Sequence, residues 1–278
     1  MVGAAADYAA SKGRLSQKQA ESIKKTSAAF RKSADDISES EEYFIGRAVA
    51  AQLLGRYPPL KDAQLNYYVQ AVTQVVAMKS DRPEIYRGYH AQVMDTSEVN
   101  AFAAPGGFVF VTKGLLRLMQ NEDQLACVLA HELAHVSKKH GLKTIQTARL
   151  TQAFAVLGAE TARSLTREED SQLAAAFEGS IKDIVSELVV NGYSQDKEFE
   201  ADQYGAFYAQ RSNYDPRALD KLLSRLDEAQ GNGRGWYKTH PAADERQGEL
   251  AQYRYAPGPG FKRSPARDKR FKKALERL

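Results

Sequence analysis

The sequence predicts an α+β fold that is mainly helical and contains one small mixed β-sheet. Apolar positions with helical spacing recur over most of the 278 residues, whereas β-type composition is confined to residues 85–112. A chain of this length can bury a sizeable hydrophobic core in one domain. We expect that domain over residues 41–255, after a polar helical extension at 1–40 and before a basic tail at 256–278.

The composition excludes several classes of protein. The net charge is only +4, and basic and acidic residues are interleaved along most of the chain, which argues against a nucleic-acid binder. The single cysteine, Cys127, excludes an internal disulfide and a cysteine-rich zinc finger. No apolar run approaches the roughly 18 residues that would span a bilayer. Because the cysteine framework is missing, we expect the fold to rest on packing and on any metal held by histidines and carboxylates.

Two helices are expected ahead of the sheet. Ser38 followed by Glu41 has the form of a capping box, and the helix that it opens should end near Gly55. A second helix is expected over residues 60–78.

The sheet itself is predicted from β-branched and aromatic residues on both sides of a Pro105-Gly106-Gly107 turn, so it should end in a hairpin. His90 lies among these residues and is expected to be an ordinary sheet side chain.

Helices are expected over the rest of the domain. Asn121 is the predicted N-cap of a central helix, and Gly141 follows a basic run that predicts the C-terminal end of that helix. The later helices are predicted as two within 142–192, one at 194–211 after the cap Ser194, and one from Pro216 through Leu226.

The central helix carries the chemical signal of the chain, His131-Glu132-Leu-Ala-His135. Histidines four residues apart on a helix point the same way, with Cβ atoms about 6 Å apart, so both imidazoles can reach one ion. Glu132 is turned by roughly 100° from His131, which suits a base beside the metal rather than a ligand. The motif predicts one zinc ion per chain, with Glu132 as the general base.

A catalytic zinc needs a third protein ligand and one open position. Cys127 lies about 12 Å along the helix axis from His135, too far to share an ion, and is expected in the core. His140 lies about 140° round a continuous helix from His135 and is expected at the surface.

An acidic helix offers better candidates for the third ligand. Glu198 and Asp202 share one face at i and i+4, so one carboxylate can bind the metal while the other orients a ligand histidine. Glu200 is expected to point elsewhere.

These residues resemble the gluzincin metallopeptidases of the BepA, HtpX and loiterin group, in particular the BepA and loiterin branch. The resemblance covers about residues 41–255, with its motifs in the family's order. The matching segments are His131-Glu-Leu-Ala-His135, Lys139-His140-Gly141, Tyr193 to Asp202, Asn100 to Thr112, Asn213 to Pro216 and Thr239-His240-Pro241. The resemblance implies a zincin fold with endopeptidase activity, in which an edge strand of the sheet faces the active-site helix.

The same resemblance assigns roles to single residues. It implies that Glu198 is the third zinc ligand and that Asp202 holds a ligand histidine. An extended substrate would lie along the edge strand that contains Asn100, Ala101 and Phe102.

The resemblance also places His240 over the active site. There it would occupy the open position of zinc in a latent enzyme, or, swung away, stabilise the oxyanion of the transition state. The glycines at 231–235 would supply the hinge.

Together these patterns predict a zinc endopeptidase that acts on extended or misfolded polypeptides. The rival from another class is a chaperone-like zinc protein that binds unfolded chains without cutting them, which the presence of the base Glu132 disfavours. A zinc amidohydrolase with other substrates is disfavoured by the pair Glu198 and Asp202 and by the edge-strand segment.

The resemblance implies work in envelope or mitochondrial quality control. We expect the bacterial periplasm rather than a mitochondrion or the cytoplasm, with a signal peptide already removed ahead of the Ala-rich start. Residues 261–278 hold eight Lys/Arg and two Asp/Glu. We expect this tail to be solvated and partly disordered, with contact to anionic lipid or an envelope protein as the alternative.

Overall fold

The computed structural model describes residues 37–144, 178–179, 181–230, 239–240, 243–252, 261 and 264–278. The predicted extension before residue 37, most of the two helices predicted within 142–192, and the glycine-rich loop at 231–235 lie outside the described residues.

The first two described helices begin with side-chain caps. α3 (Glu39–Arg56) opens with the predicted capping box, in which Ser38 and Glu41 each accept the other's backbone N–H. α4 (Ala63–Ala77) begins later than the predicted residue 60 because Asp62 is its N-cap and accepts from the N–H of Leu65.

The sheet has three strands in the order β1-β3-β2. β1 (His90–Met94) runs parallel to β3 (Phe108–Thr112), and β2 (Ala101–Ala104) pairs antiparallel with β3. The predicted hairpin is therefore β2 and β3, joined by the short 3-10 turn η2 (Pro105–Gly107). Gly106 has φ +68, and a Cβ there would lie 2.6 Å from the Cα of Tyr43, so this turn requires glycine. The predicted mixed sheet is confirmed, with β2 at one edge.

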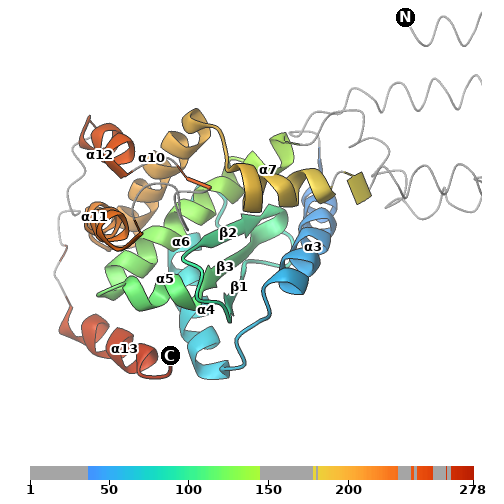
Figure 1. Cartoon of the computed structure of the whole chain (residues 1–278). Coiled ribbons are helices and arrows are strands. Elements are labelled where there is room, and N and C mark those ends of the chain that lie inside the picture. Colours follow the sequence, from blue (N-terminus) through green and yellow to red (C-terminus); the bar gives the residue numbers. More distant parts are fainter. Residues whose placement is uncertain are drawn as a thin grey trace, which may run out of the picture.

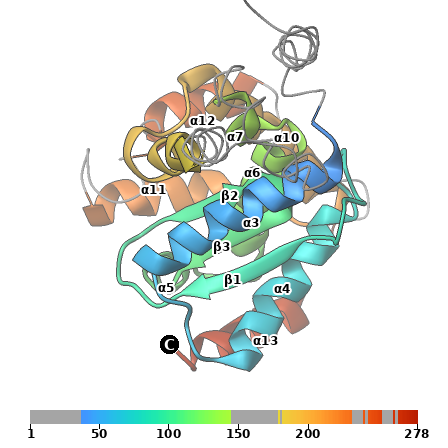
Figure 2. The same cartoon turned by 90° about the vertical axis from the view of Figure 1, so that its right-hand side faces the viewer.

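Helices cover both faces of the sheet (Figures 1 and 2). One hydrophobic core joins α4 and the central helix α6 (Glu122–Ser137) to one face of the strands. A second core joins α3 and residues 181–189 to the other face. The members of the second core include Ile45, Val49, Leu53, Phe102, Phe110, Ile184 and Leu188.

The central helix α6 is almost completely enclosed. Its N-cap is Asn121, as predicted, and all residues from Glu122 to Val136 except Asp123 are buried. α5 (Lys113–Leu118) precedes it, and α10 (Gln195–Arg211) packs along it. Gly205 of α10 permits this close packing, because a Cβ there would lie 2.9 Å from the backbone nitrogen of His131. The helices α6 and α10 are therefore in close contact beside His131 of the histidine motif.

The end of α6 differs from the prediction. The helix stops at Ser137 rather than near Gly141, because Lys139 adopts the left-handed conformation with φ 56. A short helix, α7 (His140–Lys143), then starts in a new direction and contains Gly141. Residues after Lys139 therefore do not continue the geometry of α6.

The remaining elements complete the helical layer. They are the π-helix η4 (Glu187–Asn191), α11 (Ala218–Gln230), α12 (Ala243–Gln252) and α13 (Pro265–Leu275). Among the described helices, none is long and apolar enough to cross a membrane.

The predicted solvated tail is wrong for the part of it that the structure describes. α13 packs against α4 and α6 near the C-terminus (Figure 1), and Phe271 is buried. Glu122, at the start of α6, accepts hydrogen bonds from Arg270 of α13 and from Tyr68 and Tyr214. The basic composition of the tail did not indicate that α13 buries Phe271 or that Arg270 pairs with the buried Glu122.

Candidate metal centre

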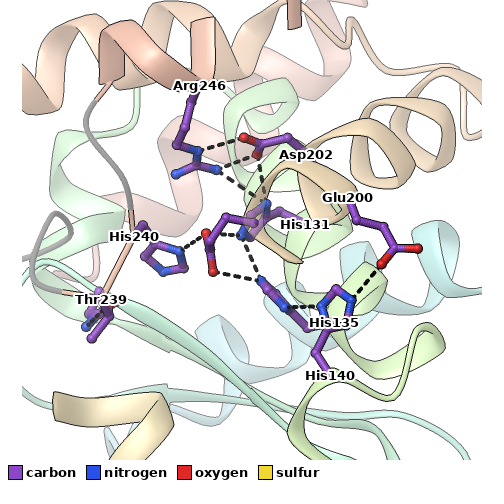
Figure 3. Close-up of polar contacts among 10 residues, drawn as sticks. His131, His135, His140, Glu200, Asp202, Thr239, His240 and Arg246 are labelled. Carbon is purple, nitrogen blue, oxygen red and sulfur yellow. Dashed lines mark hydrogen bonds and ion pairs between the residues drawn. The ribbon is translucent and has the colours of Figure 1, made fainter. Parts of the chain in front are cut away.

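Four buried side chains converge between α6 and α10 (Figure 3). His131, His135, Glu198 and His240 each offer one ligand atom, and these atoms lie within 4.8 Å of one another. Figure 3 labels the three histidines of this cluster. The Nε2 atoms of His131 and His135 are 3.1 Å apart. The Glu198 carboxylate lies 3.5 Å from Nε2 of His131 and 3.4 Å from Nε2 of His135. The i, i+4 histidines and the acidic helix thus meet at one point, as the resemblance implies.

The electrostatics of this point keep the Glu198 carboxylate ionised. Burial opposes the charge of Glu198, but His240 and His131 outweigh burial and hold its pKa well below the usual range. Burial and Arg246 likewise oppose the charge of His131, but its hydrogen bonds to Asp202 and Glu198 raise its pKa to about 9. A buried, ionised carboxylate that faces two imidazoles is therefore suited to bind a cation.

Two orphaned atoms support the fit of a metal. Oε1 of Glu198 and Oε1 of Glu132 are buried and accept no hydrogen bond from any residue that the structure describes. A buried charged oxygen without a partner is costly. Imidazole nitrogen and carboxylate oxygen are donors that suit zinc. The residues present therefore fit a zinc ion.

Glu132 lies beside this cluster without joining it. Its side chain is buried and lines a small cavity together with His135 and His240. Burial raises the pKa of Glu132 to about 7, and the nearby Glu198 carboxylate adds to the shift. A carboxylate with a pKa near neutrality can both accept and return a proton.

Asp202 contacts a candidate ligand as expected. Its Oδ1 lies 2.9 Å from Nδ1 of His131. Its second partner, Arg246 of α12, was not predicted from the sequence. Arg246 donates from Nε to Oδ2 at 2.8 Å and from Nη2 to Oδ1 (Figure 3). Arg246 is fully buried, although its segment is polar and otherwise resembles a surface helix.

We expect Arg246→Met to lower the free energy of unfolding by about 3–5 kcal/mol, because it leaves the buried carboxylate of Asp202 without its cation. Denaturant titration in the presence of a chelator measures this without a contribution from metal. Arg217→Met is the matched control, since Arg217 is half-exposed and pairs with Asp215, and we expect a change below about 1 kcal/mol. Equal effects of the two substitutions would contradict the role of Arg246.

His140 corrects a prediction. It is buried rather than at the surface, with Nδ1 2.8 Å from Nδ1 of His135 and Nε2 3.0 Å from Oε2 of Glu200 (Figure 3). The predicted angle of about 140° assumed a continuous helix, whereas the chain turns at Lys139 and brings the ring back. Glu200, expected to point elsewhere, is the outer partner of this contact.

The predicted edge-strand residues lie on β2 or directly before it. Ala101 and Phe102 of β2 line the cavity beside Glu132, and the buried Asn100 donates from Nδ2 to Oγ1 of Thr239 at 3.3 Å. Thr239 is held in turn against Gly192, where a Cβ would lie 2.2 Å from its carbonyl oxygen.

The cavity that remains measures about 10 Å³, room for about one water molecule. Besides the residues already named, Glu187, Leu188, Gly192, Tyr193 and Thr239 line this cavity.

Two other predictions concern residues outside the cluster. Cys127 is buried in the main core and its thiol donates to the carbonyl oxygen of Asp215 at 3.3 Å, which confirms it as a core residue. Burial raises the pKa of this thiol well above its usual value. His90 stands at the start of β1 and stacks on Phe108, as expected for a sheet side chain.

Comparison with known proteins decides the family. The model of peptidase family M48 matches residues 63–254, which include the whole cluster. The chain belongs to peptidase family M48. This membership confirms the resemblance to the metallopeptidase group inferred from the motifs.

Several M48 relatives are similar to this chain. The beta-barrel assembly-enhancing protease of Escherichia coli (strain K12) is 29% identical over 213 residues, which is 76% of this chain and 43% of that protein. The metalloprotease YcaL of the same strain is 33% identical over 159 residues, 56% of this chain and 58% of YcaL. The mitochondrial metalloendopeptidase OMA1 of Schizosaccharomyces pombe is 30% identical over 162 residues, 55% of this chain and 43% of OMA1. The chain spans less than half of the beta-barrel assembly-enhancing protease.

Proposed function

We propose that this M48 protein is a zinc-dependent endopeptidase, with zinc held by His131, His135 and Glu198. The observation that carries the proposal is the convergence of these three buried side chains around a carboxylate oxygen that has no hydrogen-bond partner among the described residues. The family and the names of its relatives support a metalloendopeptidase. A zinc ion in such a ligand set supplies a Lewis acid and an activated water near neutral pH.

Glu132 performs the proton transfers in this proposal. Its carboxylate takes the proton of the attacking water and returns it to the leaving amine of the substrate. Two features of Glu132 support this role. Its Oε1 is without a hydrogen-bond partner among the described residues, and its side chain lines the cavity together with the proposed ligand His135.

The substrate is proposed to be an extended or misfolded polypeptide that pairs with the edge of β2. An edge strand offers backbone hydrogen bonds, which recognise an extended chain with little regard to side chains. Ala101 and Phe102 lie on this edge and line the cavity beside Glu132. A cavity of about 10 Å³ admits no peptide, so binding requires movement of the residues that close it.

His240 is proposed to keep the resting enzyme closed. Its Nδ1 lies 2.6 Å from Oε2 of Glu198, and its side chain is buried beside the proposed zinc ligands. From this position it competes for the coordination site that water needs.

We expect His240→Ala to raise the rate of peptide hydrolysis, because the substitution removes the side chain that closes the site. A closed state favoured by about 1.4 kcal/mol corresponds to a rise of about tenfold. Initial rates on an unstructured protein measure the effect. A fall of about 10²-fold would instead assign His240 to stabilisation of the transition state, and an unchanged rate would exclude both roles.

The proposed location is the bacterial envelope, on the periplasmic side, in protein quality control. The similarity to a beta-barrel assembly-enhancing protease supports contact with envelope proteins. The alternative function is a chaperone-like zinc protein that binds unfolded chains without cutting them. It would use the same zinc site, but Glu132 would transfer no proton.

Mass spectrometry of an unstructured protein incubated with the purified chain separates the two functions. New internal termini that vanish with chelator support the endopeptidase, whereas binding without new termini supports the chaperone-like alternative.

A further inference from the structure

The second nitrogen of each candidate ligand histidine has a different kind of partner. Nδ1 of His131 meets the buried carboxylate of Asp202 directly at 2.9 Å. Nδ1 of His135 meets another imidazole, that of His140, at 2.8 Å, and this ring continues through Nε2 to Glu200 at 3.0 Å. His135 and His140 are buried, whereas the Glu200 side chain is 41% exposed. A chain of three side chains thus links the candidate metal centre to the surface.

Only one placement of protons on His135 and His140 leaves a nitrogen of His135 free to bind a metal. To offer the lone pair of Nε2, a neutral His135 must carry its proton on Nδ1. That proton is donated to Nδ1 of His140, whose own proton must then be on Nε2 and is donated to the Glu200 carboxylate. Every donor in this arrangement has an acceptor. In the reverse arrangement the proton of His135 would be on Nε2, where it would block the metal.

Local structure fixes both rings in this geometry. The left-handed Lys139 ends α6 and lets α7 begin at His140, which directs the imidazole back toward α6. Tyr193 stacks on His135, with ring centroids 4.4 Å apart, and meets His140 edge-on at 5.7 Å. The ring of His135 therefore has little freedom to rotate.

We propose, on the basis of the zinc peptidase function proposed above, that His140 is a positioning residue that acts together with Glu200. The pair holds His135 in the tautomer that binds metal and so raises the affinity of the site for zinc. His140 does not touch the substrate in this proposal. Outer partners of ligand histidines commonly contribute 10- to 100-fold to metal affinity.

The test is the zinc dissociation constant, measured by competition with a chromophoric chelator. We expect His140→Phe to weaken zinc binding by about 10- to 100-fold, because it keeps a ring but removes both hydrogen bonds. His140→Asn should restore much of the affinity, since its Oδ1 can accept the Nδ1 proton of His135. Glu200→Ala, on a half-exposed side chain, should weaken binding less and leave the fold intact.

The absorption spectrum of bound cobalt(II) is a second readout, and like zinc affinity it does not depend on catalysis. The visible absorption of the cobalt(II)-loaded protein reports ligand geometry, and we expect it to change in His140→Phe and to return toward wild type in His140→Asn. His90→Phe is the matched control, because His90 is an exposed histidine on β1 and should change neither affinity nor spectrum.

The outcomes separate this inference from the function on which it rests. A wild-type chain that binds no zinc would overturn the proposed function. Tight zinc binding by wild type, with equal affinity and spectrum in His140→Phe and Glu200→Ala, would overturn the positioning role alone. If His140→Phe fails to fold, Glu200→Ala still decides, because unchanged zinc affinity together with an unchanged cobalt spectrum in that variant contradicts the proposal.

Discussion

Replacing Glu132 by Gln is expected to reduce peptide hydrolysis by about 10²- to 10⁴-fold while the protein keeps its fold and its zinc. Gln has nearly the same size and fills the same buried position, but it cannot take a proton from water at neutral pH. The three proposed ligands are untouched, so the metal content should equal that of wild type. Rates on an unstructured protein and zinc analysis of the same preparation measure both quantities.

Glu178→Gln is the control for this substitution, because Glu178 is an exposed carboxylate paired with Lys182 and distant in the sequence from the motif. It should leave the rate unchanged. A Glu132→Gln protein with activity near that of wild type would exclude Glu132 as the base. Loss of zinc together with loss of activity would instead make Glu132 part of the metal site.

Removal of a proposed ligand is expected to abolish stoichiometric zinc. His135→Ala and Glu198→Ala each leave only two of the three donors, and each leaves a buried group whose partner is gone. Because a metal stabilises only the state that binds it, added zinc should raise the melting temperature of wild type but not of these variants. Metal analysis after dialysis and thermal melts with and without zinc measure the two effects.

Cys127→Ala is the matched control for the ligand variants. It removes the only cysteine, a potential zinc ligand by type, from the same helix α6, yet its thiol donates to the carbonyl of Asp215 in the core. We expect it to retain one zinc per chain. Full zinc in Glu198→Ala would show that the third ligand is assigned wrongly.

The sequence was sufficient for the parts of the site that depend on one helix at a time. His131 and His135 share a face because they are four residues apart within α6, whose N-cap Asn121 was recognisable. The face shared by Glu198 and Asp202 follows from the same periodicity in α10. Helical geometry alone therefore placed each pair, and the resemblance supplied the expectation that the two pairs meet.

The parts that failed depend on backbone geometry or packing between distant segments. Lys139 is a left-handed residue that is not glycine, so nothing in the sequence indicated that α6 ends there and that His140 turns inward. Arg246 lies in a polar helix whose composition resembles a solvated surface, and its burial depends on Asp202.

The basic tail was misjudged for a similar reason. The eight Lys and Arg residues led to the prediction of a solvated tail. In the structure Phe271 is buried in the core and Arg270 donates a hydrogen bond to the buried Glu122. Charge counts describe the solvent-exposed face of a helix better than its packed face.

The central claim is that hydrolysis depends on one zinc ion held by this chain. The most direct measurement strips the protein with chelator, returns zinc in measured equivalents, and follows both bound metal and the hydrolysis of an unstructured protein. The account predicts no hydrolysis by the stripped protein and a rise that reaches its plateau at one bound zinc per chain. Hydrolysis that persists in the stripped protein, or one bound zinc that restores none, would contradict it.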